Sequence, residues 1–297
     1  MKKYTLNNFE KEFPNDNACL DALFKSLHGD MLNCPKCGEA PNFKRISTRK
    51  CYQCQHTNCQ YQIYPMKGTP FQKSTTGLKQ WFYAFYLLTS SRNGVSAKQF
   101  ERILSVSYPT ALRMTHKIKE LMGSGKATKL FGVVEMDEAY IGGLAKNMHY
   151  KKRMELIQGR GSVNKTPVFG MLEREGSIIV TVVDKTNAKT LMPIIKFSVH
   201  KKSLVITDGY PVYKNLYKDF NEHEVIDHHR GQYARGAFHT NSIESFWSHL
   251  KRMLRGTHIH VSRKHLQKYV DEAIFRYEHR HKPGEMFHAL LAKITNK

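Results

Sequence analysis

GVVEMDEAYIGG, residues 132–143, places acidic side chains within an apolar and β-branched run. A run of this kind bounded by glycine predicts a strand. Burying a lone carboxylate among apolar residues is costly unless a positive group, such as a metal ion, neutralises it. We therefore interpret Asp137 as a candidate metal ligand near the point where the strand runs out. The alternative is a strand-end acid facing solvent, because the adjacent Glu138 shows that acids are tolerated here.

The rest of the chain beyond residue 130 predicts an α/β fold. Runs rich in apolar and β-branched residues, bounded by Gly, Pro, Asn or Asp, predict strands at 131–141, 166–175, 177–184, 203–208 and 223–228. A crossover helix is expected at 187–201, and residues 241–297 are mostly helical. A sheet with helices mixed in and following it indicates a mixed α/β core.

A second acid, Asp208, ends the predicted strand LVITD and directly precedes Gly209. Ligands of α/β proteins collect at the carboxyl ends of strands, which makes Asp208 a candidate ligand. An aspartate before a glycine is also a common turn residue, and that alternative stays open.

The third acid, Glu244, lies on the helix predicted from residue 241, in NSIESFWSHLKR. Lys251 follows two turns later on the same face, so an acid for a metal and a base for a DNA phosphate point the same way. Asn241 and Glu244 also fit a capping box, with Asn241 as the N-cap, and this alternative competes with metal ligation. The buried stripe of this helix is predicted to be Ile243, Phe246, Trp247, Leu250 and Leu254.

Three acids from separate segments suit the binding of divalent metal ions. We expect Asp137, Asp208 and Glu244 to be catalytic and to hold magnesium, with Asn241 as the alternative to Glu244. Two Mg²⁺ (or Mn²⁺) ions roughly 3.5–4 Å apart would activate the attacking oxygen and stabilise the leaving oxygen. Water would attack in a cutting step, and a DNA 3′-hydroxyl in a joining step.

Five of the six cysteines fall between residues 34 and 59, in CPKCG and CYQCQHTNC. Zinc needs four ligands in a tetrahedral array, and Cys34 with Cys37 forms a first pair. The second pair is either Cys51 with Cys54 or Cys54 with Cys59, because zinc accepts both spacings. A module of this size has too little core to fold without its metal, so we expect structural Zn²⁺.

The segment between the cysteines and the strands is helical. Residues 95–122 predict a helix, a short turn and a second helix, with Ser96 as the first N-cap. In a helix-turn-helix, the second helix would present Arg113 and Lys117 to a DNA groove, whereas the alternative is an ordinary helical hairpin. We therefore divide the chain into an N-terminal helical segment (1–30), a zinc ribbon (31–70), a helix-turn-helix-like module (71–128) and a catalytic domain with C-terminal helices (129–297).

The charge of the chain indicates a polyanionic partner. Lysine and arginine number 47 against 25 acids, which gives a formal net charge of +22. Such an excess favours nucleic acid through phosphate neutralisation. No apolar run reaches the roughly 18–20 residues of a membrane span, and the N-terminus lacks the apolar region of a signal peptide. We expect a cytoplasmic, nucleoid-associated protein with no membrane partner.

The order of these motifs resembles a known group. The ribbon (CPKCG, YQC, CQYQI), then GTPF and LKQWFYAFYLL, then EMDEAYIGG, TDGY and HTNSIESFWSHLKR are similar to bacterial insertion-sequence transposases of the DDE superfamily. The most similar group has an N-terminal zinc ribbon and is related to eukaryotic Merlin elements. The resemblance implies a ribonuclease H-like catalytic fold with Asp137, Asp208 and Glu244 as the triad. Some members carry Asn in the third position, so Asn241 stays in view.

The resemblance also implies roles for the remaining candidates. It favours Cys54 and Cys59 as the second zinc pair, although a gap two residues longer than the commonest form keeps Cys51 in competition. It implies that Lys251 contacts DNA, and we expect Arg252 and Arg255 to do the same.

The function expected from this resemblance is DNA transposition. The enzyme would bind the terminal inverted repeats of its insertion sequence as double-stranded DNA, cleave the ends and transfer them to target DNA, working as a homo-oligomer. The alternatives are a metal-dependent nuclease or resolvase, and a non-catalytic zinc-containing DNA-binding regulator.

Overall fold

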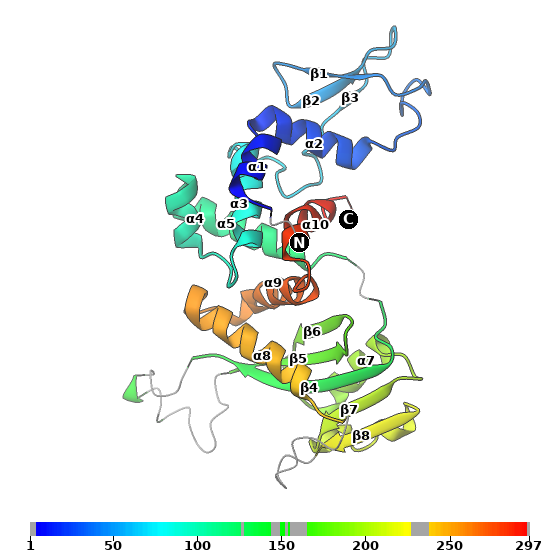
Figure 1. Cartoon of the computed structure of the whole chain (residues 1–297), viewed down its shortest axis with the longest axis vertical. Helices are drawn as coiled ribbons and strands as arrows, with labels where there is room; N and C mark the ends of the chain where they lie inside the picture. The colour runs from blue at the N-terminus through cyan, green and yellow to red at the C-terminus, as the bar shows by residue number, and fades with distance from the viewer. Residues whose placement is uncertain are drawn as a thin grey trace. The chain divides into compact units, whose positions relative to one another are not determined.

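The computed structural model describes residues 4–125, 128–143, 149–151, 154, 165–226 and 238–295. The chain forms two compact units (Figure 1). The first comprises residues 1–125 and 282–297, and the second comprises residues 126–281. The two ends of the chain therefore belong to the same unit.

The first unit joins its terminal helices through aromatic rings. The ring of Phe13 lies 5.0 Å from that of Phe82, and the ring of Phe9 lies 5.8 Å from that of Phe287, measured between centroids. These edge-on pairs stabilise the unit beyond their area burial. The helices described in it are α1 (Leu6–Glu12), α2 (Asp16–His28), α3 (Leu78–Ser90), α4 (Ala97–Leu104), α5 (Tyr108–Met122), the short η7 (Pro283–Glu285) and α10 (Met286–Ala292).

The predicted helix, turn and helix are confirmed as α4 and α5. Ser96 caps α4, because its side chain accepts a hydrogen bond from the backbone N–H of Gln99 at 3.2 Å. Ser105 ends α4 with a left-handed φ of 52°. Pro109 lies in the first turn of α5, where a missing N–H costs nothing. Binding of DNA by this pair stays a prediction.

A small antiparallel sheet carries Cys51 and Cys54. Its strands β1 (Phe43–Ile46), β2 (Cys51–Cys54) and β3 (Gln62–Ile63) are ordered β1-β2-β3. Phe43 pairs with Cys54, and Ile46 pairs with Cys51. Side chains alternate along a strand, so Cys51 and Cys54, three residues apart, point to opposite faces of β2.

The second unit is a mixed α/β structure around a five-stranded sheet, which confirms the predicted mixed α/β core. The strand order is β6-β5-β4-β7-β8. β4 and β5 are antiparallel, as are β5 and β6, whereas β7 runs parallel to both β4 and β8. The strands are β4 (Val133–Ile141), β5 (Thr166–Glu173), β6 (Ile178–Val182), β7 (Leu204–Asp208) and β8 (Glu222–Ile226).

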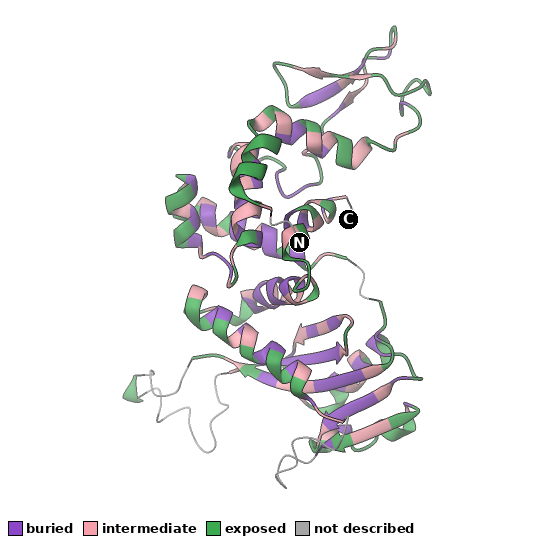
Figure 2. Cartoon of the chain, viewed as in Figure 1, coloured by how far each residue is buried: buried purple, intermediate pink, exposed green. Residues whose placement is uncertain are grey.

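Helices cover both faces of this sheet, and the central strands are buried (Figure 2). On one face, Ala139 and Val168 pack with residues of α8 and α9. On the other, Met136 and Phe169 pack with residues of α7. The helical elements described here are α7 (Ala188–Ser198), η2 (Pro211–Tyr213), η3 (Leu216–Lys218), α8 (Asn241–Met253), the π-helical η5 (Leu254–His258), η6 (Arg263–His265) and α9 (Leu266–Glu278).

The helices of both units are short. The longest described α-helix, α5, has 15 residues, and α8 and α9 have 13 each. None of the described helices is both long and apolar enough to cross a membrane.

Candidate functional site

Asp137 and Asp208 lie on neighbouring parallel strands. Val133 pairs with Leu204 and Glu135 pairs with Ile206, so the same register continued two residues further brings Asp137 beside Asp208. Asp208 ends β7, as predicted. Asp137 does not end β4, and that expectation was wrong, because antiparallel pairing with β5 carries β4 on to Ile141.

Helix α8 is held close to these strands by its tryptophan. The indole N–H of Trp247 donates to Asp137 Oδ2 at 3.0 Å. On β5, Gly170 pairs with Asp137, and a Cβ at this glycine would lie 2.7 Å from the Trp247 ring. Glycine is therefore needed here so that the helix can approach the sheet.

Three carboxylates share one electrostatic environment. Burial, together with the nearby charges of Asp208 and Glu244, raises the pKa of Asp137 to about 6 against the opposing effect of hydrogen bonds. Burial and the charges of Asp137 and Asp208 likewise raise the pKa of Glu138 to about 7, although Tyr213 donates a hydrogen bond to it. A divalent cation among these groups would favour their charged forms.

The capping box considered as the alternative for Asn241 and Glu244 is absent from α8. The N-cap is Thr240, without a side-chain cap hydrogen bond, and Asn241 is the first helical residue. Glu244 instead accepts a hydrogen bond from the Thr240 hydroxyl at 2.9 Å. This alternative does not apply, because N–H groups in the first turn of α8 bond to a side chain from another segment.

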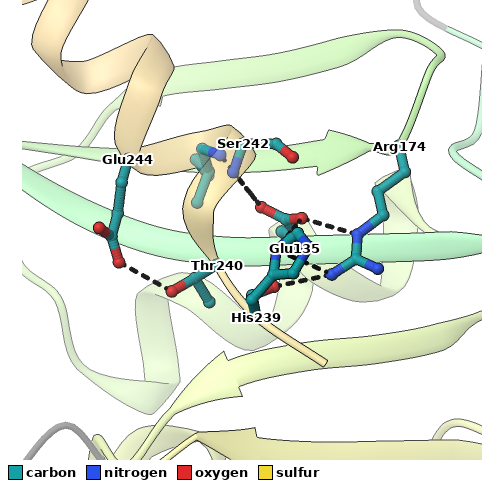
Figure 3. A network of polar contacts seen from close by, with 7 residues as sticks. Glu135, Arg174, His239, Thr240, Ser242 and Glu244 are labelled. Atoms are coloured by element: carbon teal, nitrogen blue, oxygen red, sulfur yellow. Dashed lines mark hydrogen bonds and ion pairs between the residues drawn. The ribbon is translucent and has the colours of Figure 1, made fainter. Parts of the chain in front are cut away.

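That side chain is Glu135 on β4, which is fully buried (Figure 3). Its Oε2 accepts from the backbone N–H groups of Ser242 at 2.9 Å and Ile243 at 3.1 Å. Its Oε1 accepts from Arg174 Nε at 2.8 Å, and Arg174 also donates to the carbonyl of His239 at 2.9 Å. Sequence patterns did not single out Glu135, although it lies two residues before Asp137 and hence on the same face of the strand.

The basic end of α8 borders a pocket of about 530 Å³. Lys251 and Arg255 line it together with Tyr140 and Ile141 from the end of β4. Arg252 joins Lys251 and Arg255 around a second, more open hollow. The other basic side chains that line the first pocket are Lys165, His260 and Arg263.

The predicted DNA-binding residues of the first unit lie on α5. Arg113 is exposed. Lys117 is half-buried, and its Nζ donates to the backbone carbonyl of Pro70 at 2.9 Å. Arg113 is therefore open to a DNA phosphate, whereas Lys117 also has a role within its own unit.

Four cysteines meet beside the small sheet. The sulfur atoms of Cys34, Cys37, Cys54 and Cys59 all lie within 4.8 Å of one another. Two of the separations are 3.7 Å (Cys34 to Cys59) and 3.9 Å (Cys37 to Cys54). Thiolates held about 2.3 Å from a tetrahedral zinc ion are about 3.8 Å apart, so the cluster is consistent with structural zinc.

Two other side chains of this module that could bind zinc, Cys51 and His56, lie outside the cluster. Cys51 is buried on the opposite side of β2, with its sulfur 4.0 Å from Gln62 Oε1. The ring of His56 bonds to the carbonyl of Ala40 at 2.8 Å. Within the described part of the chain, the four cysteines are the one group of His, Cys, Asp and Glu side chains close enough to hold a single ion.

Comparison with known proteins identifies both units. Residues 129–278, half of the chain, match an ISXO2-like transposase domain, and residues 14–62 match a transposase zinc-ribbon domain. A protein of transposable element ISH50 from Halobacterium salinarum is 27% identical over 287 residues, which cover 93% of this chain and 95% of that protein. A transposase-like protein from Haemophilus influenzae is 30% identical over 100 residues, covering 34% of this chain and 80% of that protein.

The match over the second unit contains all three carboxylates and the basic end of α8. The match over the first unit contains the four clustered cysteines. The chain therefore belongs to the ISXO2-like (IS1595) family of DDE transposases and carries an N-terminal zinc ribbon.

Proposed function

We propose that this transposase binds the terminal inverted repeats of an insertion sequence, cleaves the DNA at those ends and joins the 3′-ends to target DNA. Asp137, Asp208 and Glu244 are the catalytic acids in this proposal. The single observation that carries it is the environment of Asp137, which is half-buried and lies near the charges of the other two acids.

The donor set fits hard divalent cations. Carboxylate oxygens from β4, β7 and α8 are the ligands that Mg²⁺ and Mn²⁺ prefer, and ions bound there would polarise the scissile phosphate and its attacking oxygen. Asp137 is oriented by Trp247, and Asp208 by the backbone N–H of Tyr210 at 3.0 Å. Glu244 is oriented by the Thr240 hydroxyl. Each acid is thus held in place before substrate binds.

DNA lies, in this proposal, along the basic end of α8. Lys251, Arg252 and Arg255 neutralise phosphates there, next to the strand that carries Asp137. Arg113 and Lys117 of α5 provide a separate contact to the inverted repeat. The five-stranded mixed sheet with helices on both faces supports the ribonuclease H-like fold. Two ends are brought together by a homo-oligomer.

Strand joining separates this function from its rivals. We expect the purified protein with Mg²⁺ to cut a duplex that carries an element end and to join its 3′-end to a supercoiled plasmid, seen as labelled plasmid on a gel. A nuclease or resolvase of the same fold cuts without joining the element end to the plasmid. A DNA-binding regulator slows the migration of the duplex on the gel and leaves the duplex intact. Either result would overturn the proposal.

Replacing Lys251 with Ala should weaken DNA binding in a salt-dependent way. Loss of one phosphate contact lowers the slope of log K against log salt by about 0.9. Fluorescence anisotropy with a labelled duplex at several salt concentrations measures this slope. Lys189→Ala is the control, because Lys189 is exposed on α7, on the other face of the sheet. Equal slopes for the two variants would mean that Lys251 does not contact a DNA phosphate.

A further inference from the structure

We infer that Glu135 is a positioning residue, which fixes helix α8 on strand β4 so that Glu244 faces Asp137. Glu135 joins the two elements directly, because it belongs to β4 and accepts from the backbone N–H groups of Ser242 and Ile243 in the first turn of α8. The inference rests on the proposed role of Glu244 as the third catalytic acid.

Two successive carboxylates of β4 hold the same helix. Glu135 and Asp137 alternate with Met136, which packs in the core on the opposite face. Glu135 binds the start of α8, and Asp137 binds Trp247 further along it. Two attachment points fix both the rotation of the helix and its position along the strand.

Glu244 lies between these two attachment points. It follows Ile243, whose N–H bonds to Glu135, and it precedes Trp247, whose indole bonds to Asp137. Its carboxylate points along the helix toward Thr240 (Figure 3). A shift of the first turn therefore moves the third acid directly.

The carboxylate of Glu135 has polar partners on two sides. Arg174 follows β5 and contacts Glu135 Oε1 at 2.8 Å, and His239 Nδ1 lies 3.5 Å from the same oxygen. Glu135 has no exposed surface. Helix N-termini favour negative charge, so the first turn of α8 stabilises the carboxylate as well. Arg174 and the helix thus neutralise Glu135 from two sides.

The length and the charge of the Glu135 side chain have different roles. Its length lets the carboxylate reach the helix, and its charge pairs with Arg174. Glu135→Asp keeps the charge and shortens the reach, whereas Glu135→Gln keeps the reach and removes the charge. Glu175→Gln is the matched control, because Glu175 is exposed in the turn between β5 and β6.

Hydrogen exchange of the metal-free, DNA-free protein tests the placement of α8. We expect peptides covering residues 240–250 to exchange at least about tenfold faster in Glu135→Asp than in the control, while the small cysteine-bearing sheet exchanges as before. In the cleavage assay the same variant should be about 10–100-fold slower, the usual cost of losing a group that orients a ligand. Affinity for DNA should be unchanged, and half-maximal cleavage should need more Mg²⁺.

Each other outcome overturns the inference. Unchanged exchange in α8 means that Glu135 does not hold the helix, and faster exchange with full cleavage means that its placement is irrelevant to the chemistry. If neither Glu135→Asp nor Glu135→Gln melts cooperatively, the residue serves folding alone. The proposed role of Glu244 fails separately, by full activity of Glu244→Gln, and that result leaves the exchange measurement intact.

Discussion

Asp137→Asn and Asp208→Asn should each lower the rate of DNA cleavage by about 10³-fold or more, while DNA affinity stays within about twofold. Asparagine keeps the size of the side chain and removes the charge that would hold a divalent cation, whose stabilisation of the transition state is worth several kcal/mol. Single-turnover cleavage of a labelled duplex measures the rate, and anisotropy measures the affinity.

Glu244→Gln should lower the rate of DNA cleavage as much as the two aspartate variants do. Asn241→Ala should cleave DNA at the wild-type rate. Asn241 is exposed at the first position of α8, and Thr240 is the N-cap, so the alanine removes no cap. Loss of cleavage in Asn241→Ala with retention in Glu244→Gln would transfer the third position to Asn241. Retained cleavage in either aspartate variant would remove that residue from the triad.

Thermal melting distinguishes lost chemistry from lost structure. The pKa of Asp137 is raised from its ordinary value of 3.8 to about 6, mainly by burial, so its ionised form disfavours the folded state. This cost appears as pH rises above about 4 and is complete above about 6; the size of the shift puts it on the order of 3 kcal/mol. Metal-free Asp137→Asn should therefore melt higher than wild type at pH 7. A lower melting temperature would indicate structural damage.

Local sequence patterns predicted most of the second unit. The runs that predicted strands at 131–141 and 203–208 contain β4 and β7, and the apolar stripe of α8 was placed correctly at Ile243, Phe246, Trp247 and Leu250. These elements are decided by side-chain periodicity and by the glycine, proline and asparagine residues around them. Both kinds of signal lie within a few residues of the element that they determine, so one sequence is enough to predict these elements.

Pairing between distant segments was not predictable in the same way. Asp137 was expected near a strand end, yet β4 continues because β5 pairs with it beyond the point where β7 stops. A cap by Asn241 was left open as an alternative, yet Glu135, more than a hundred residues earlier, accepts from the first turn of α8. Only the register of the sheet and the approach of the helix reveal these contacts.

Whether Cys51 or Cys59 completes the zinc site depends on the backbone conformation of a short segment. Read as a turn, the two-residue gap between Cys51 and Cys54 would bring both sulfurs to one ion. The segment is instead a strand, in which residues three apart face opposite ways, and this leaves Cys59 beside Cys34. The resemblance had favoured Cys54 with Cys59, and the observed cluster contains that pair.

Cys59→Ser should lose bound zinc and unfold the small sheet, whereas Cys51→Ser should keep one zinc ion per chain. The three strands have 4, 4 and 2 residues, too few to form a stable core alone. Binding of a structural zinc ion contributes about 10–16 kcal/mol to folding in modules of this size, far more than other contacts there can replace. Serine in place of a ligating thiolate removes a quarter of the ligand set.

The comparison of these two cysteines is sharp because both are buried and both change to serine. Loss of packing is therefore matched, and only the distance to the other sulfurs differs: Cys59 is 3.7 Å from Cys34, while Cys51 contacts Gln62. Metal analysis after gel filtration gives zinc per chain, and limited proteolysis reports cleavage between residues 34 and 63. Zinc retained in Cys59→Ser but lost in Cys51→Ser would assign the fourth ligand to Cys51. Equal loss in both would mean that zinc content follows packing of the sheet rather than direct ligation.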